Sequence, residues 1–165
     1  MNRELMRAAE RRDNRRMAIC AHEVGHGLAG MAFGLETNGV RLKFGLFGGF
    51  IGGSCDWDYF DDNTPLDHKI AWLVGIMGGH AAEIRFCQLY LRMDARKAFK
   101  YGRDWAEGDY QNLDHYRAKW RRDGVRVSRD WAFDQASRVI ERNADRLDRL
   151  TLRLDKATRL PGTAL

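Results

Sequence analysis

The pentapeptide His22-Glu23-Val24-Gly25-His26 restricts the fold of this chain more than any other feature. Residues four apart share one face of an α-helix at about 6 Å, so two helical imidazoles can bind one ion. Glu23 then lies where its carboxylate can reach a water molecule on that ion. We therefore predict that a helix over about residues 4–33 carries the motif, with an interruption near residues 11–15 as the alternative.

The surroundings of the motif favour a metal site over an accidental match. A chance HExxH pattern is expected in roughly one such chain in 160. Met17-Ala18-Ile19 and Leu28-Ala29 flank the motif, and unpaired His and Glu side chains are unfavourable to bury among apolar residues. The alternative is a core histidine pair with a surface glutamate. Zinc held by His22 and His26, with Glu23 as the base that deprotonates a bound water, gives hydrolytic chemistry.

Two histidines are too few for a catalytic zinc ion, which takes a third protein ligand. The metzincin extension of the motif requires Gly and His where this chain has Ala29 and Ala32. A thermolysin-like Glu, about nineteen residues after His26, would fall near Gly45. The ligand must come from further along the chain, and spacing alone leaves seven candidates open: His68, His80, Glu83, Asp104, Asp109, Asp114 and His115.

The remaining pattern predicts a single, mainly α-helical domain over residues 1–165 with a small β element, an α+β fold. Thr64 and Pro65 are typical of a helix start. A loosely alternating, glycine-rich stretch follows the first helix and is typical of short strands. The predicted elements after the first helix are a β region over 40–54 and helices over about 65–91, 109–121 and 129–157.

Composition and charge argue against several other classes of protein. The net charge is +5, but basic and acidic residues alternate, and the chain has no recognised nucleic-acid motif, so we expect no nucleic-acid partner. Cys20, Cys55 and Cys87 form no CxxC pair, which argues against zinc fingers and a disulfide framework. No apolar signal segment opens the chain, and the longest stretch without charged residues or histidine, residues 44–55, is too short to span a bilayer. We expect a cytoplasmic protein without a membrane span.

Four segments together resemble a known protein family. Residues 21–28 are similar to an AxHExGHAL helix, and Gly78-Gly79-His80-Ala81-Ala82-Glu83 is close to GGRAAE. Gly108-Asp109-Tyr110 matches a loop that ends in Asp before a helix, and residues 140–162 resemble a last helix with a Thr-Leu-x-Gly ending. Over about residues 17–162 the chain thus resembles the peptidase domain of the FtsH family, which are ATP-dependent, membrane-anchored zinc proteases.

The resemblance implies roles that spacing could not assign. It makes Asp109 the third zinc ligand, as in an aspartate zincin, and Glu83 a carboxylate that orients a ligating histidine. It also makes the glycine-rich stretch an active-site edge strand, against which an extended substrate aligns through backbone hydrogen bonds. The substrate-binding residues so implied are Gly48, Gly49, Phe50, Ile51 and Gly52.

The chain also departs from the family. His80 stands where the family has Arg, and Trp105-Ala106-Glu107 is bulkier than the family's loop. The sequence has no GxxxxGK[ST] motif for an ATPase and no membrane anchor. We therefore expect a stand-alone, ATP-independent zinc endopeptidase for unfolded or flexible polypeptides, which forms a homo-oligomer or is served by a separate ATPase or adaptor. The alternative is a catalytically silent, metal-stabilised binding or regulatory protein of the same fold.

Overall fold

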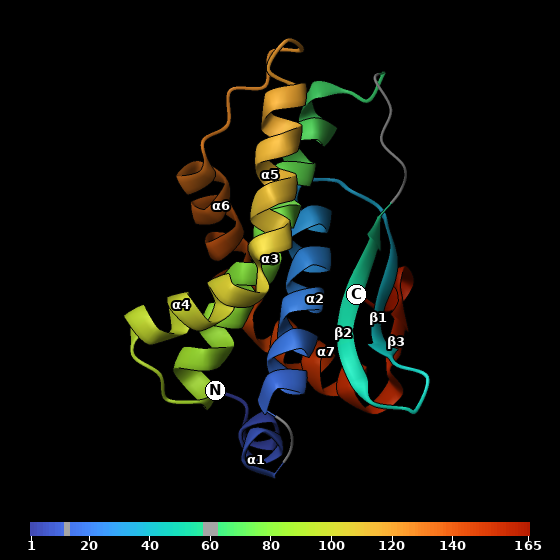
Figure 1. Cartoon of the computed structure of the whole chain (residues 1–165), viewed down its shortest axis with the longest axis vertical. Helices are drawn as coiled ribbons and strands as arrows, with labels where there is room; N and C mark the ends of the chain where they lie inside the picture. Colours follow the sequence, from blue (N-terminus) through green and yellow to red (C-terminus); the bar gives the residue numbers. More distant parts are fainter. Residues whose placement is uncertain (12–13, 58–62) are drawn as a thin grey trace.

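The computed structural model describes residues 1–11, 14–57 and 63–165 (Figure 1). It is mainly helical with one small antiparallel sheet, which confirms the predicted α+β class. The helices are α1 (Arg3–Arg11), α2 (Asn14–Ala32), α3 (Leu66–Tyr90), α4 (Ala95–Trp105), α5 (Glu107–Lys119), α6 (Arg129–Arg142) and α7 (Ala144–Ala157). The strands are β1 (Thr37–Phe44), β2 (Phe50–Trp57) and β3 (Arg159–Pro161), and a short 3₁₀ helix follows over Gly162–Ala164.

Two predicted helices are divided in the structure, and one helix was not predicted. The helix predicted over 4–33 is divided into α1 and α2, with residues 12–13 outside the described part. The helix predicted over 129–157 breaks at Asn143, whose backbone angles, φ −107° and ψ 20°, depart from those of a helix. Its backbone N–H and its side chain both donate to the carbonyl of Val139, at 3.0 and 2.9 Å. The polar segment before residue 109 contains α4, whose N-cap Asp94 accepts from the backbone N–H of Lys97 at 2.8 Å.

Helices α2 and α3 pack against each other at the centre of the molecule (Figure 1). A Cβ atom on Gly25 would lie 2.4 Å from the carbonyl oxygen of Gly78, and one on Gly78 would lie 2.4 Å from that of Gly25. Because neither residue has a side chain, the two backbones can touch at this crossing. The faces of α2 and α3 that carry the sequence motifs are thereby brought next to each other.

The sheet covers α2, and α5 packs on α3 (Figure 1). The strand order is β2-β1-β3, so β2 pairs only with β1 among the described residues and is an edge strand. Val40 and Leu42 of β1 are buried in the main core, whereas Arg41 and Lys43 are exposed. This alternation is typical of a sheet with one face on the core. Among the described residues, none of the helices has the length and apolar character needed to cross a membrane.

Candidate metal centre

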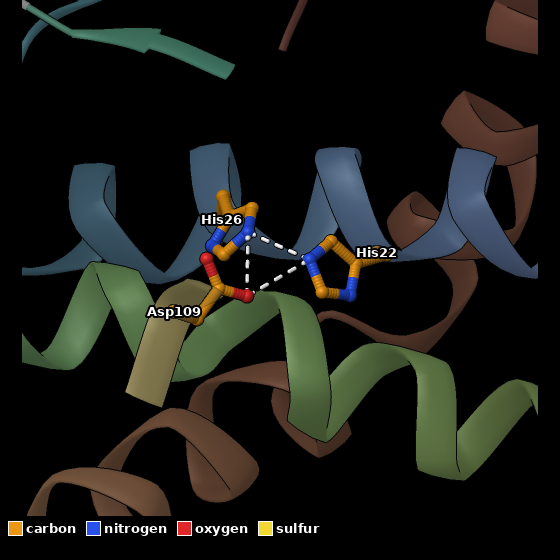
Figure 2. Close-up of side chains that lie close together, drawn as sticks. All are labelled: His22, His26 and Asp109. Atoms are coloured by element: carbon orange, nitrogen blue, oxygen red, sulfur yellow. Dashed lines mark hydrogen bonds and ion pairs between the residues drawn. The ribbon is translucent and has the colours of Figure 1, made fainter. Parts of the chain in front are cut away.

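Three side chains converge between α2 and α5 (Figure 2). His22 and His26 project from consecutive turns of α2, and their Nε2 atoms are 2.9 Å apart. Oδ2 of Asp109, from the first turn of α5, lies 3.0 Å from Nε2 of His22 and 3.4 Å from Nε2 of His26. The structure therefore brings together the histidine pair derived from spacing and the aspartate implied by the resemblance.

Helix α3 holds both imidazoles through their other ring nitrogen. Nδ1 of His26 is 3.0 Å from the carbonyl oxygen of Gly75, and Nδ1 of His22 is 3.0 Å from Oε2 of Glu83. A carbonyl or carboxylate oxygen accepts, so each Nδ1 carries the hydrogen and donates it. The lone pairs of both Nε2 atoms then face Asp109, which is how ligating histidines are oriented in metal sites.

The donor set fits a divalent cation. Among the described residues, Oδ2 of Asp109 is buried and receives no hydrogen bond, although it faces two ring nitrogens. Three atoms with lone pairs repel one another unless a proton or a metal ion lies between them. Two imidazole nitrogens and one carboxylate oxygen, all within 4.8 Å of one another, form a ligand set that zinc accepts with a position left for water.

Gly79 leaves room at the centre of this group. A Cβ atom on Gly79 would lie 2.5 Å from Nε2 of His26 and 2.7 Å from Nε2 of His22. Real side chains do not approach so closely, so any larger residue would displace an imidazole. The glycine pair Gly78-Gly79 therefore has two separate uses, one in the contact of α2 with α3 and one in the space beside the histidines.

Glu23 lies on the side of the site that faces the sheet. Its side chain is buried, and a Cβ atom on Gly53 of β2 would come within 2.5 Å of its Cγ. Burial raises the pKa of Glu23, and the imidazoles of His22 and His26 only partly offset this effect. A buried carboxylate that holds a proton more readily than usual is suited to accept and return one near neutral pH.

The titration behaviour of the ligands reflects their mutual contacts. Burial lowers the pKa of His22 and of His26, but contacts with Asp109, and for His22 also Glu83, outweigh burial and raise both pKa values. Burial by itself would raise the pKa of Asp109, yet the two imidazoles hold it well below the usual range of a carboxyl. Burial raises the pKa of Glu83. The site thus attracts positive charge, which in the metal-free protein is carried by protons.

The other six candidates for the third ligand lie elsewhere or act differently. Glu83 contacts His22 from behind, and His80 is fully buried against Tyr110. Asp114 pairs with Arg129, and His115 is exposed. His68 and Asp104 belong to no group of three potential ligands among the described residues. The one such group in the described part of the chain is His22, His26 and Asp109.

A pocket of about 390 Å³ opens beside the centre. Besides the site residues, its lining includes Gly53, Ser54, Cys55, Trp57, Trp72 and Ile76. The five residues expected to bind substrate lie just before this stretch, with Gly48 and Gly49 in the β1–β2 turn and residues 50–52 at the start of β2. The strand implied by the resemblance thus borders the site, but the residues that line the pocket follow Gly52.

Sequence reasoning did not find the apolar wall of this pocket. Trp57 and Trp72 are in edge-to-face contact at 4.7 Å between ring centroids, and Trp57 contacts the ring of His26 at 5.9 Å. Trp57 is the last residue of β2 and stands beside Asp56 in an acidic stretch that is typical of a surface loop, and Trp72 falls within a helical pattern that could equally be core. Only the packing of β2 on α2 and α3 brings these rings to the pocket.

This chain matches no model of a protein family, and a search of curated proteins found no match.

Proposed function

We propose that this chain is a zinc-dependent endopeptidase of the FtsH-peptidase type that cleaves unfolded or flexible polypeptides. The observation that carries the proposal is the convergence of His22, His26 and Asp109 next to Glu23, at the floor of an open pocket. A site that only stabilised the fold would have no use for a buried glutamate beside the ligands or for open access.

The residues of the centre take separate roles in this proposal. His22, His26 and Asp109 hold the zinc ion, and when bound it polarises the substrate carbonyl and lowers the pKa of a water to about 7. Glu23 takes a proton from the attacking water at its carboxylate and delivers it to the departing amine. Glu83 and the carbonyl of Gly75 keep the imidazoles oriented by accepting from their Nδ1–H groups.

The proposed substrate follows from the shape of the surroundings. Strand β2 has an open edge, to which an extended peptide can add through backbone hydrogen bonds. Such pairing requires backbone groups that are not already used in folded structure. Trp57, Trp72 and Ile76 give the pocket an apolar side that can receive a side chain of the substrate. Delivery by a separate ATPase or adaptor, self-assembly and a cytoplasmic location stay predictions from the sequence.

The replacement Glu23→Gln tests the mechanism because it removes the base but none of the ligands. With fluorescein-labelled casein as substrate, we expect kcat to fall at least about 100-fold. Metal analysis should still find one zinc ion per chain. Glu107→Gln, an exposed glutamate in the first turn of α5, is the matched control and should keep wild-type activity.

Two results would contradict the proposal. Cleavage that survives Glu23→Gln would exclude Glu23 as the base. A zinc-loaded wild-type protein that cleaves nothing in a broad peptide library would favour the silent binding protein instead. Asp109→Ala separates these cases from an error in the ligand set, because it should abolish stoichiometric zinc binding.

A further inference from the structure

His80, in α3, is fully buried and contacts Tyr110 in the first turn of α5. Its Nδ1 is 2.8 Å from the hydroxyl of Tyr110, and its Nε2 is 3.3 Å from the carbonyl oxygen of Phe99. A carbonyl oxygen can only accept, so Nε2 carries the ring hydrogen and donates it. Nδ1 is then unprotonated and accepts the hydrogen of the Tyr110 hydroxyl. The geometry thus fixes the direction of both hydrogen bonds.

The ring of His80 is also held by its packing. Its centroid lies 5.0 Å from that of Phe99, 5.4 Å from that of Tyr110 and 5.5 Å from that of Phe133. On the remaining side, a Cβ atom on Gly102 would come within 2.9 Å of the imidazole. With contacts to α4, α5 and α6, the imidazole has no room to change its orientation.

Tyr110 is the residue after Asp109, so whatever fixes one restrains the other. The first turn of α5 also packs through the buried Ala106, and the guanidinium of Arg103 lies 5.5 Å from the centroid of the Tyr110 ring. Ala106 makes no side-chain cap, however, and a Cβ atom on Gly108 would meet nothing within 4 Å. The buried Leu113 holds the helix only from the next turn onward. The contact of Tyr110 with His80 therefore ties the ligand-bearing turn to α3.

Helix α3 then supports every ligand of the centre. Glu83 accepts from His22, and the carbonyl of Gly75 accepts from His26. We propose that His80 is a positioning residue that, through the Tyr110 hydroxyl, keeps Asp109 within reach of the two histidines. The inference rests on the metal centre of the proposed function, but it concerns zinc affinity rather than peptide cleavage.

The replacement Tyr110→Phe tests this role by removing a single hydroxyl group. We expect the Kd for zinc, measured by competition with a chromophoric chelator, to rise about 10- to 100-fold. The matched control is Tyr90→Phe, which removes another hydroxyl bonded within the protein, to Asp148, away from the centre. The control should lower the melting temperature of the metal-free protein and leave the Kd for zinc unchanged.

Variants of His80 test whether His80 and Tyr110 act through the hydrogen bond that joins them. His80→Leu should raise the Kd as much as Tyr110→Phe does, and the double variant should add no more than twofold, because the same hydrogen bond between His80 and Tyr110 is lost in each case. His80→Gln should recover part of the affinity, since an amide can accept from Tyr110 and donate to the carbonyl of Phe99. If His80→Leu does not fold, the two tyrosine variants decide.

The outcomes separate this inference from the peptidase proposal. Kd values for Tyr110→Phe within twofold of wild type, or an equal rise in Tyr90→Phe, would overturn the positioning role and leave the peptidase proposal standing. A wild-type protein that binds zinc but cleaves nothing would refute the peptidase and not the positioning role. A wild-type protein that binds no zinc would overturn both.

Discussion

Helix α3 contributes to two buried polar clusters, and they differ in how their charges are compensated. In the first, Nη1 of Arg85 donates to Asp148 at 2.8 Å, and the hydroxyl of Tyr90 donates to the other oxygen of the same carboxylate. In the second, two imidazoles meet the carboxylates of Glu83 and Asp109 with no cationic side chain between them. In the first cluster a permanent charge, the guanidinium of Arg85, balances the carboxylate, whereas among the described residues the second has only its imidazoles to carry positive charge.

This difference separates a structural cluster from a binding site. The burial of charged groups does not by itself distinguish a structural cluster from a binding site, because a paired charge such as Asp148 can serve only to join α3 to α7. The second cluster differs in two ways. The ligand atoms of His22, His26 and Asp109 face one another with their lone pairs. Among the described residues, one buried oxygen of Glu83 and one of Asp109 receive no hydrogen bond. The two substitutions below each change one cluster, and stability and zinc affinity are measured for both variants.

The largest expected effect is on stability, from Asp148→Ala. Removal of this carboxylate leaves the guanidinium of Arg85, 8% exposed, without its close partner. We expect the free energy of unfolding to fall by about 3–5 kcal/mol, as measured by urea denaturation. The Kd for zinc of the folded variant should stay within twofold of wild type. A loss below about 1 kcal/mol, or a large change in Kd, would show that the two clusters are not distinct.

The opposite pattern is expected for Glu83→Gln. The variant loses the carboxylate that orients His22, so the Kd for zinc should rise about 10- to 100-fold in a chelator competition assay. Burial already raises the pKa of Glu83, so a neutral amide of the same shape should leave the metal-free protein within about 1 kcal/mol of wild type. A variant that was less stable but bound zinc normally would place Glu83 with the structural cluster.

The smallest effect is a dependence of metal-free stability on pH. The pKa values of His22 and His26 are raised in the folded state above the ordinary value of 6.5. A histidine whose pKa is raised on folding stabilises the folded state below pH 6.5. This stabilisation is lost as the pH rises through the pKa values of the folded state. We expect the melting temperature of the protein in chelator to decrease as the pH rises above 6.5, and saturating zinc to remove the decrease. A metal-free melting temperature that rose over this range would contradict the assignment.

The sequence predicted those parts of the centre that depend on local geometry. The positions of His22, Glu23 and His26 follow from one helical turn, which the apolar pattern of α2 already indicated. Asp109 could not be chosen from spacing, because its distance from His26 in space depends on how α5 packs on α3. It was selected only by the resemblance to a family motif.

Other features depend on contacts that no local pattern records. His80 and Tyr110 are 30 positions apart, and nothing near either residue indicates that they touch. Asp94 is a recognisable N-cap, so α4 could have been predicted from it. The break at Asn143 was harder to predict, because the apolar repeat continues from α6 into α7 and only the backbone angles of Asn143 depart from those of a helix.

The crossing of α2 and α3 at Gly25 and Gly78 has a consequence for ion binding. Since the two backbones are already in contact there, the helices cannot approach further, and the crossing sets a minimum distance between the donors on α2 and their supports on α3. A centre built on such a crossing is preorganised, so its ligands need little rearrangement when an ion arrives. Less of the binding free energy is then spent on ordering the protein.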